Sequence, residues 1–526
     1  MIDRHAELPT WRSVDVNDTP TSYLEVGTGP TLVFWHGWGL DDASYRGRPG
    51  WAGARQLDRW LSLRAGERDP LLRSTVVTVR LLDQLPDWEL LQARVEQATR
   101  RLPMFRSRVV VPPLRLATPR WTETELDLDW HLRRTSLPAL SGWRELLDLA
   151  ARKAVTAFDP ARPLWELTVV EGPPDGRAAL VMVFHHALTD GIGGVQIAME
   201  LFDLKRSPGA VAQPVAVAQV DDLAGLRLAW ESIGYDASRL SALLRALPRA
   251  SVTGGLAALR SPRRAVTATF STVRSVLRFV APVSKTRSPV MTGRRLGRTF
   301  DVLSVLLADL HRAGHSTGGH LNDAFLGGVT GGLRRYHEKH GAEVDELWVT
   351  RPISLRRPSD PPGGNLITLV RLAVPAGLPD PAERMAAIAE VVERWRAEPA
   401  LALTQPIAMA LNLLPAGVVG GMLKHVDFLA SNVPGFPIPI FLAGAQVEAY
   451  YPFGPTIGAS VNLTLLSYGD TCCVGVSCDP GAIPDPELLM QCLRDGFDEV
   501  LDLGGDHTGT RLPAHPPLEG AQPWKS

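Results

Sequence analysis

The chain has 526 residues, of which 45% are hydrophobic and 21% are charged. These are ordinary globular proportions, and they exclude an intrinsically disordered chain, a coiled-coil rod and a collagen-like repeat. The 55 basic and 56 acidic residues nearly balance, so no overall positive charge attracts nucleic acid. At about 100–200 residues per domain, the length predicts two or more domains with a sizeable core.

The cysteines do not have the spacing of a structural zinc site. All four, Cys472, Cys473, Cys478 and Cys492, lie in one short C-terminal stretch, and we expect buried, reduced thiols and no metal site. The first fifteen residues lack the basic and apolar regions of a secretory signal, which predicts a cytoplasmic protein. The uncharged run from Pro399 to Leu423 contains polar residues, prolines and glycines, which favour a buried, broken helix over a membrane span.

Residues 1–52 are predicted to form short strands and turns. The apolar run Thr31–Trp35, followed by His36-Gly37, resembles the opening of an α/β-hydrolase, where a buried strand ends in an HG turn. Such an enzyme needs a serine on a sharp strand-to-helix turn. The GxSxG pattern centred on Ser316 instead follows residues 301–314, which have a helical pattern. We therefore interpret residues 1–52 as a hydrolase-like N-terminal extension, and a serine hydrolase stays an alternative.

Residues 53–205 alternate between helix and strand patterns and form the first predicted lobe. Asp87 precedes apolar residues at helical spacing and is expected to cap a helix. We expect strands over residues 73–82 and 164–172. Residues 178–194 are expected to form a strand, a loop and the start of a helix.

Residues 206–300 form a predicted basic linker rich in Pro, Ala, Ser and Arg. From Ala237 to Phe300 there is no Asp or Glu against thirteen Arg and Lys residues. A solvated basic helix face would explain this composition. Contact with anionic phospholipid or with CoA phosphates would explain it as well, because apolar residues separate the charges in residues 271–280.

Residues 301–505 form the second predicted lobe, and residues 506–526 form a flexible tail. A helix–loop–helix is expected to span residues 301–340, and a strand is expected over residues 346–356. Asp380, followed by Pro and then Glu at the third position, predicts a helix start. The remaining sequence predicts strands, with a two-residue hairpin turn at Gly469-Asp470.

The most informative motif is HHxxxDG, which begins at His185 and His186 and ends at Asp190 and Gly191. An imidazole that is neutral near pH 7 can take a proton from a hydroxyl if its tautomer and orientation are fixed. Asp190 is close enough in sequence to brace the loop. Gly191 removes a side chain where a substrate must pass or the backbone must turn.

With several further blocks, this motif resembles the bacterial wax ester synthase/acyl-CoA:diacylglycerol acyltransferase family over about residues 53–505. HHxxxDG alone would fit a superfamily that also includes chloramphenicol acetyltransferases and peptide-synthetase condensation domains. The further blocks favour the lipid acyltransferases. These blocks are Pro163-Leu164-Trp165-Glu166, Asn322-Asp323, Pro352-Ile353-Ser354-Leu355-Arg356, Gly364-Asn365 and Ser431-Asn432-Val433-Pro434-Gly435.

The resemblance implies an α/β fold of two lobes, each like chloramphenicol acetyltransferase, with a substrate tunnel between them. It implies that His186 is the general base that deprotonates the acceptor hydroxyl, which then attacks the thioester of acyl-CoA directly. Neither a covalent acyl-enzyme nor a metal is required. No cofactor is expected, and acyl-CoA is a co-substrate.

The resemblance also assigns other residues to the site. Asp190 is expected to be structural and to pair with an arginine, of which Arg356 is one candidate. Asn322 is expected either to cap a helix or to contact substrate or oxyanion, and Asp323 belongs to the same block. The residues from the last block look like a turn that lines the tunnel, as a structural turn or as a substrate contact; they are Ser431, Asn432, Pro434 and Gly435. Trp165, Trp130 and His131 are interpreted as structural.

The predicted function is O-acyl transfer from long-chain acyl-CoA to diacylglycerol, a fatty alcohol or both, which makes triacylglycerol or wax ester. Three alternatives stay open: acylation of a polyketide, sugar or amine on the same fold, a lipid-binding protein without turnover, and the serine hydrolase. Peripheral contact with the inner membrane face or with lipid inclusions is a separate hypothesis. The sequence fixes neither the acyl-chain length nor the preferred acceptor nor the oligomeric state.

Overall fold

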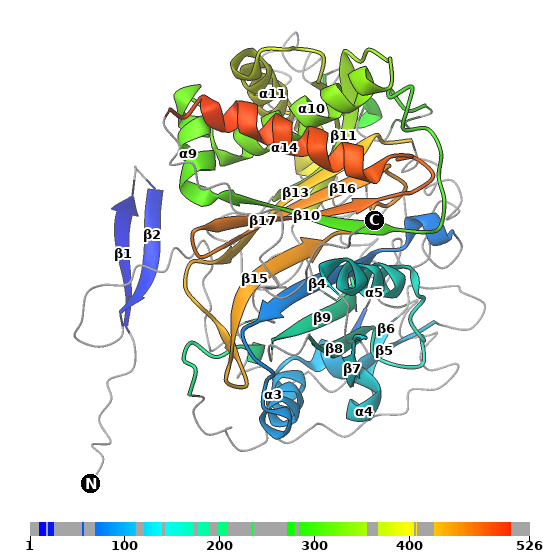
Figure 1. Cartoon of the computed structure of the whole chain (residues 1–526), viewed down its shortest axis with the longest axis vertical. Helices are drawn as coiled ribbons and strands as arrows, with labels where there is room; N and C mark the ends of the chain where they lie inside the picture. The colour runs from blue at the N-terminus through cyan, green and yellow to red at the C-terminus, as the bar shows by residue number, and fades with distance from the viewer. Residues whose placement is uncertain are drawn as a thin grey trace, which may run out of the picture. The chain divides into compact units, whose positions relative to one another are not determined.

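The structure is a computed structural model, and Figure 1 shows its helices and strands. It describes residues 10–16, 19–25, 55–56, 69–111, 120–138, 142–172, 177–188, 198, 200–207, 234, 271–278, 281, 283, 285–354, 367–403, 407 and 425–505. The chain divides into two compact units. The smaller unit comprises Met1–Gly53 and Ser354–Ile367, and the larger unit comprises Ala54–Ile353 and Thr368–Ser526.

The smaller unit contains an antiparallel hairpin of β1 (Thr10–Val16) and β2 (Thr19–Glu25). This hairpin agrees with the short strands and turns expected in residues 1–52. The run Thr31–Trp35 and the HG turn after it lie outside the described residues, so the hydrolase-like interpretation of this segment stays a prediction.

The first sheet of the larger unit has six strands in the order β14-β15-β4-β9-β8-β7. Neighbouring strands are antiparallel except for the parallel pair β7 and β8. Strand β4 lies within the strand expected over residues 73–82, and seven of its eight residues are buried because it is a central strand. The strands are β4 (Thr75–Leu82), β7 (Leu132–Ser136), β8 (Trp165–Glu171), β9 (Ala178–His185), β14 (Phe441–Leu442) and β15 (Ala445–Phe453).

Helices and a small sheet complete this lobe. Helix α3 (Trp88–Arg101) starts at Asp87, whose carboxylate accepts the amide proton of Leu90 at 2.9 Å, so the predicted cap is confirmed. Helix α5 (Trp143–Val155) packs against β4 and β9 and also contacts β10 of the second sheet. The three-stranded sheet has the order β3 (Arg55–Gln56), β6 (Arg120–Glu123), β5 (Ser107–Val110).

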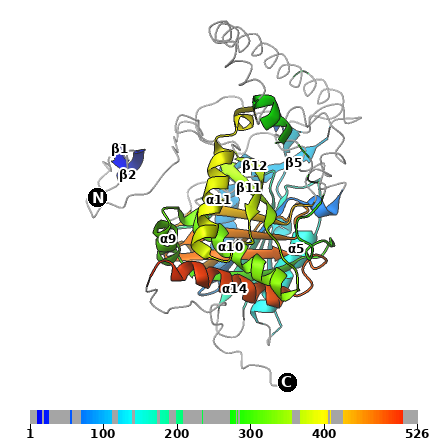
Figure 2. The same cartoon turned by 90° about the horizontal axis from the view of Figure 1, so that it is seen from above.

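The second sheet has six strands in the order β10-β17-β16-β13-β11-β12. Four helices lie together on one side of it: α9 (Leu307–Ser316), α10 (Leu321–Lys339), α11 (Pro381–Arg396) and α14 (Pro486–Asp502) (Figures 1 and 2). The strands are β10 (Thr299–Leu306), β11 (Glu346–Ser354), β12 (Ile367–Pro375), β13 (Phe428–Phe436), β16 (Val461–Tyr468) and β17 (Thr471–Cys478).

Close packing of α10 on α14 depends on glycine. A Cβ added to Gly496 would lie 2.3 Å from the backbone nitrogen of Gly332, so a side chain at this crossing would push the two helices apart. Helix α11 starts at Asp380, whose carboxylate accepts the amide proton of Glu383 at 2.8 Å with Pro381 in the first turn, as predicted. The hairpin between β16 and β17 turns at Gly469, which has a φ of 59°.

One strand pair connects the two halves of the chain. Strands β14 and β15 come from the second half, yet β15 pairs with β4 in the first sheet and also contacts β16 and β17. The rings of Phe300 and Phe453 stack with centroids 4.1 Å apart. The predicted boundary between the lobes at residue 301 stays a prediction. The two sheets do not divide the chain there, because β14 and β15 come after residue 301 but belong to the first sheet.

Two sequence expectations are wrong in detail. Residues 301–306 belong to strand β10 and not to a helix, because they pair along their whole length with β17. Residues 431–435 lie in strand β13 and not in a turn, because residues 431–433 continue the parallel pairing of β13 with β16. Its register shifts between Val433 and Phe436, which places the Pro-Gly pair in a bulge.

Shorter helical segments occur at η1 (Pro70–Leu72), η2 (Pro103–Arg106), α4 (Leu128–His131) and η4 (Pro399–Leu403). The predicted basic linker includes a helical stretch over residues 271–278. All four cysteines are buried and free, as expected of buried thiols. Within the described ranges, no helix has the length and apolar character needed to cross a membrane.

Candidate functional site

The histidine pair begins at the last residue of a fully buried strand. His185 ends β9, and its backbone N–H donates to the carbonyl oxygen of Leu164 at 2.9 Å, just before β8. The N–H of His186 donates to the carbonyl oxygen of Ser74 at 2.7 Å, just before β4. The N–H of Leu188 returns to the carbonyl oxygen of His185 at 2.9 Å. The motif therefore starts as a tight turn fixed to the strands on both sides.

The two imidazoles differ in their surroundings. His185 is only 7% exposed, and its Nδ1 accepts the backbone N–H of Ala187 at 3.0 Å. A nitrogen that accepts an N–H carries no proton, so the proton of neutral His185 lies on Nε2. The Phe158 ring meets the His185 ring edge-on, with centroids 6.4 Å apart. His186 is half-buried, so its side chain is the more accessible of the pair.

The end of the motif, from Thr189 to Gly191, lies outside the described residues. The candidate ion-pair partner of Asp190, Arg356, also lies outside the described residues. The expected ion pair and the role of Gly191 therefore stay predictions.

His185 lies at one end of the first sheet, and two pockets open at this end. Strand β4 begins at Thr75, which pairs with His185, and β8 begins at Trp165, which pairs with Phe184. One pocket lies on the β8 side of the histidines and the other on the β4 and β15 side, where the second sheet also contributes.

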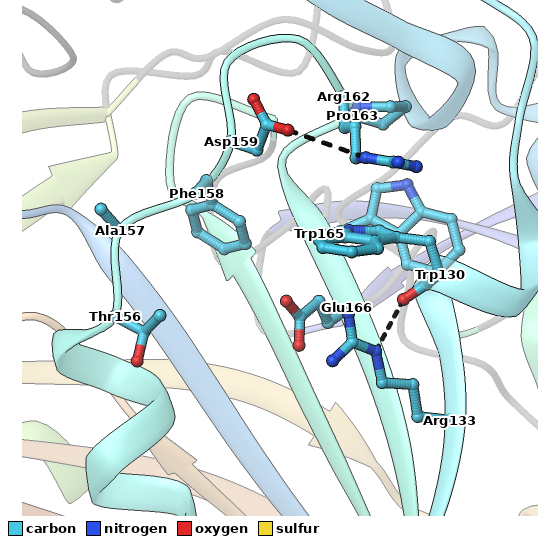
Figure 3. A pocket seen from close by; sticks show the side chains of 10 residues that line it. All are labelled: Trp130, Arg133, Thr156, Ala157, Phe158, Asp159, Arg162, Pro163, Trp165 and Glu166. Carbon is cyan, nitrogen blue, oxygen red and sulfur yellow. Dashed lines mark hydrogen bonds and ion pairs between the residues drawn. The ribbon is translucent and has the colours of Figure 1, made fainter.

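The pocket on the β8 side has a volume of about 260 Å³ (Figure 3). Its lining residues are Trp130, Arg133, Thr156, Ala157, Phe158, Asp159, Arg162, Pro163, Trp165 and Glu166. The pocket between the sheets has about 20 Å³, and its lining residues are Pro70, Arg73, Thr75, Ala154, Val155, Leu296, Arg298, Phe300, Gly454, Pro455, Thr456 and Ser477.

Two of the separate sequence blocks meet in the second lobe. Asn432 on β13 donates its Nδ2–H to Oδ1 of Asn322 at 3.0 Å. Asn322 is the second residue of α10 and is half-buried. Since its carbonyl oxygen accepts this bond, its own NH₂ group points elsewhere and is oriented as a donor. The structure thus brings together the Asn-Asp block and the Ser-Asn block.

Neighbours of this asparagine pair have structural contacts. Asp323 is buried, and its Oδ2 accepts the N–H of His320 at 2.8 Å, so Asp323 and not Asn322 supplies the helix-capping contact. Burial lowers the pKa of Arg351, and the nearby charge of Asp323 opposes that shift. A Cβ added to Gly435 would lie 1.7 Å from the carbonyl oxygen of Ser467, so only glycine fits at this close approach.

Ser431 is half-buried on the same strand, and the side chain of Pro434 lies outside the described part. The expected substrate contacts of both residues stay predictions.

Ser316 is not on a nucleophile elbow. It is the last residue of α9, and its hydroxyl donates to the carbonyl oxygen of Ala313 at 2.8 Å, within the same helix. The strand before it, β10, ends ten residues earlier. A hydroxyl held in a helical back-bond lacks the strand-to-helix turn that exposes a catalytic serine.

Trp165 and His131 stack on each other, a contact that agrees with the structural role expected for each. Trp165 is 1% exposed, and its Nε1–H donates to the carbonyl oxygen of Phe105 at 2.8 Å. The His131 ring stacks on it at 4.5 Å, and Nδ1 of His131 lies 2.7 Å from the carbonyl oxygen of Trp165. Burial lowers the pKa of His131, which keeps its ring neutral.

Sequence reasoning did not single out Phe158, which contacts His185, or Arg133, which lines the pocket on the β8 side. Phe158 reaches the His185 ring from the end of α5, and Arg133 lines the same pocket from β7. The only signal for Phe158 in the sequence is its place just before the Asp159-Pro160 break. In the described part of the chain, no group of three or more His, Cys, Asp or Glu residues could hold a metal ion.

Comparison with known proteins identifies the family. The family model for the wax ester synthase/diacylglycerol acyltransferase catalytic domain matches residues 61–325. The model for the C-terminal domain of the same family matches residues 363–500. The chain belongs to the wax ester synthase/diacylglycerol acyltransferase family. It is therefore an enzyme of the acyltransferase class.

Relatives from Mycobacterium tuberculosis agree with this. One, from strain H37Rv, has a name that assigns it diacylglycerol O-acyltransferase activity; it is 38% identical over 87% of this chain and 93% of its own. A second, with a name of the same kind, is 31% identical over 76% of this chain and 87% of its own.

Solved structures show the fold. A wax ester synthase/diacylglycerol acyltransferase from Marinobacter aquaeolei VT8 matches with a TM-score of 0.57 and 19% identity, over 86% of this chain and all of that one. The first condensation domain of the CDA synthetase matches with a TM-score of 0.52 and 14% identity, over 86% of this chain and 96% of that domain. These structures share the two-lobed, chloramphenicol-acetyltransferase-like α/β fold, so the predicted fold class is confirmed.

Proposed function

We propose that this acyltransferase moves a long-chain acyl group from acyl-CoA to the hydroxyl of diacylglycerol, of a fatty alcohol, or of both. His186 is the proposed general base. The observation that carries this assignment is the hydrogen bond from the Ala187 amide to Nδ1 of His185. That bond leaves His185 with a proton on Nε2, so His185 is a donor and not a base, and proton transfer falls to the adjacent ring.

The proposed chemistry is direct transfer. His186 takes the proton of the acceptor hydroxyl while the oxygen forms a bond to the thioester carbonyl carbon. The tetrahedral oxyanion then collapses, the carbon–sulfur bond breaks, and the imidazolium returns its proton to the CoA thiolate. Both proton transfers use the same imidazole, so the proposal needs acyl-CoA as co-substrate and no resident cofactor.

Asn322 is the proposed donor to the oxyanion. Its NH₂ group is oriented away from Asn432, whose amide holds its carbonyl oxygen at 3.0 Å. A preorganised donor costs no reorientation when negative charge develops on the substrate oxygen. Asp190 is proposed to brace the loop through an arginine.

Diacylglycerol and fatty alcohol are the proposed acceptors because of the relatives. The mycobacterial relatives have names for transfer to diacylglycerol, and the family name and the Marinobacter protein add wax ester synthesis. Acylation of a polyketide, sugar or amine is the competing possibility, and acceptor competition separates it.

The test is product analysis with labelled palmitoyl-CoA and with diacylglycerol, hexadecanol or water as acceptor. We expect triacylglycerol or wax ester from the wild type and none from His186→Ala, with an unchanged circular dichroism spectrum. His186→Gln is a second variant, which keeps polarity and volume without the base. Full transfer by either variant would remove His186 as base. Release of free fatty acid alone would refute the transfer itself.

Peripheral membrane contact is a separate part of the proposal. Helical residues 271–278 are anchored by Ser275, which is 1% exposed and hydrogen-bonds to Glu398. On the outer face, Val273 and Leu277 are 52% and 62% exposed and lie one helical turn apart. Exposed apolar side chains among arginines suit an anionic lipid surface, where the water-insoluble acceptor resides.

Flotation with vesicles of phosphatidylcholine, with and without phosphatidylglycerol, tests the membrane proposal. We expect the enzyme to float with anionic vesicles at low salt and to float less after the double change Val273→Ser and Leu277→Ser. Flotation that ignores the anionic lipid, the salt and the double change would refute this part and leave the transfer reaction standing. The proposed location is the cytoplasm, with contact at the inner membrane face or at lipid inclusions.

A further inference from the structure

The pocket between the sheets lies where strands of both sheets begin or end. It is lined by the first residues of β4 and β10, by the end of β17 and by the segment that follows β15. The last two residues of α5, Ala154 and Val155, also line it. Neither histidine of the motif is among its lining residues, so a ligand held there does not contact the catalytic imidazoles.

Three buried residues with hydroxyl groups line this pocket. Thr75 is 5% exposed, and Thr456 and Ser477 are each 2% exposed. Within the described part of the chain, no protein atom forms a hydrogen bond with any of these three hydroxyls. A buried hydroxyl without a partner is destabilising, and nearly all such groups in proteins bond to another atom. Three of them around one small space indicate a ligand that accepts hydrogen bonds from all three.

Two arginines line the same pocket. Nη1 of Arg298 lies 3.5 Å from the buried carboxylate of Asp479, so the charge of Arg298 is balanced. Arg73 is half-buried and donates an Nη1–H to the carbonyl oxygen of Val155, at the end of α5. That bond fixes the guanidinium and uses one of its N–H groups, and the positive charge of Arg73 remains.

The charges around the pocket leave one cation over. No Asp or Glu lines the pocket, and Asp479 is the one carboxylate that pairs with either lining arginine among the described residues. Asp69 caps the short helix η1 and does not pair with Arg73. Asp301, next to the pocket on β10, is paired with Arg144 at 3.5 Å. The uncompensated charge of Arg73 therefore selects an anion for this pocket.

We propose that the pocket between the sheets binds a monatomic anion, chloride, held by Arg73 and by the hydroxyls of Thr75, Thr456 and Ser477. The volume of about 20 Å³ accommodates about one water-sized particle and is too small for phosphate or sulfate. Guanidinium N–H and hydroxyl O–H groups are all hydrogen-bond donors. A chloride ion accepts from the four residues and neutralises Arg73, whereas a water molecule would leave that charge uncompensated.

The proposed ion lies beside the backbone that holds the histidine motif. Thr75 pairs with His185 across β4 and β9, and the carbonyl oxygen of Ser74 accepts the N–H of His186 at 2.7 Å. Arg73 and Thr75 therefore flank the residue that anchors His186. Bound chloride fixes this segment and so supports acyl transfer. This effect on transfer rests on the proposed function, but chloride binding does not, so the two are measured separately.

The test of binding is chloride NMR of the full chain without acyl-CoA, because exchange with a protein site broadens the chloride signal in a saturable way. We expect Arg73→Gln to weaken chloride binding at least about tenfold, as the loss of a charge-assisted hydrogen bond requires. Arg73→Lys keeps the charge and should retain most of the binding. Thr456→Val removes one neutral donor at nearly constant volume and should weaken binding by about 2- to 12-fold. Circular dichroism checks that each variant is folded.

Thr78→Val is the matched control and should bind chloride like the wild type. Thr78 is on the same strand as Thr75 and has a buried hydroxyl without a partner in the described part, but it does not line the pocket. Crystals grown in sodium bromide locate the ion, and we expect an anomalous peak beside Arg73.

Equal chloride broadening by the wild type, Arg73→Gln and Thr456→Val would overturn the site, and so would a pocket that holds water and no bromide. Chloride binding by an enzyme that transfers no acyl group would support the site and refute the proposed function alone. Palmitoyl transfer that is equal in chloride and in gluconate would refute the effect on transfer.

Discussion

The contact between Asn432 and Asn322 offers a sharp test of how the second lobe contributes to catalysis. Asn432→Ala removes a neutral hydrogen bond of 3.0 Å and leaves Asn322 in place. Such bonds stabilise by about 0.5–1.5 kcal/mol, so we expect the rate of transfer to fall about 2- to 12-fold as the amide of Asn322 loses its orientation. Asn322→Ala removes the proposed oxyanion donor itself and should lower the rate by about 10²–10³-fold.

The double variant decides whether Asn432 acts through Asn322. If it does, the variant lacking both amides is as slow as Asn322→Ala alone, because nothing remains to be oriented. Asn322→Asp is the matched control, since it keeps the acceptor oxygen and the volume but loses the NH₂ donor. The measurement is kcat with palmitoyl-CoA under saturating acceptor. Independent, multiplicative losses would refute the positioning role, and an Asn322→Ala enzyme with normal kcat would refute the donor.

Three further expectations concern stability and reactivity. Trp165→Ala should lower the free energy of unfolding in urea by about 3–5 kcal/mol, since the ring is 1% exposed; a loss below about 1 kcal/mol would contradict its place in the core. Glu499→Gln should lower the free energy of unfolding by about 3–5 kcal/mol, because it removes the carboxylate that pairs with the buried Arg384. Glu393→Gln is the control and should have little effect, because Glu393 forms an exposed ion pair. Burial would raise the pKa of Glu499, but Arg335 and Arg384 lower it below its ordinary value. The ion pair therefore stabilises the fold at neutral pH, and this stabilisation is lost as Glu499 is protonated in acid. The stability of the Gln variant should lack this contribution to the pH dependence. Burial raises the pKa of Cys473 to about 11, so the native thiol should resist Ellman's reagent until guanidinium is added, and rapid native labelling would contradict this.

Local signals in the sequence were reliable guides to this structure. Asp87 and Asp380 both cap helices as expected, because a cap depends on a side chain and an amide only three residues apart. The hairpin at Gly469 was equally predictable, because a Gly-Asp pair between two strand patterns favours a two-residue turn, and Gly469 has the positive φ that such a turn requires. The strand before the histidine motif is apolar throughout, which fits its place inside the first sheet.

Expectations failed where distant pairing overrides local preference. Residues 301–306 contain leucine and valine at a spacing that suits a helix, but eight consecutive pairs with β17 hold β10 as a strand. Residues 431–435 contain Ser-Asn and Pro-Gly, which favour turns. Parallel pairing with β16 keeps residues 431–433 extended, and the Pro-Gly pair lies in a bulge. Neither partner strand is near in sequence, so no local pattern reveals it.

The candidate site was only partly visible for the same reason. The histidines and the two asparagines were singled out by motif, yet the hydrogen bond between Asn322 and Asn432 joins residues 110 positions apart. Phe158 has no motif, and its contact with His185 depends on how α5 ends above the sheet. Sequence patterns thus indicated which residues matter, and the fold shows which of them touch.

The strand that crosses between the halves explains why the histidine loop needs both of them. Strand β9 is held by β4, and β4 would be an edge strand if β15 did not pair with it. Arg80 on β4 is fully buried, hydrogen-bonds to the hydroxyl of Tyr450 on β15 and lies 4.1 Å from the centre of its ring. The carboxylate of Asp83 accepts the N–H of Gln446 at 2.7 Å, at the start of the same pairing. Because β15 also contacts β16 and β17, the second sheet supports the strand on which β4 and β9 rest. The backbone at His186 is therefore positioned by residues from both halves of the chain.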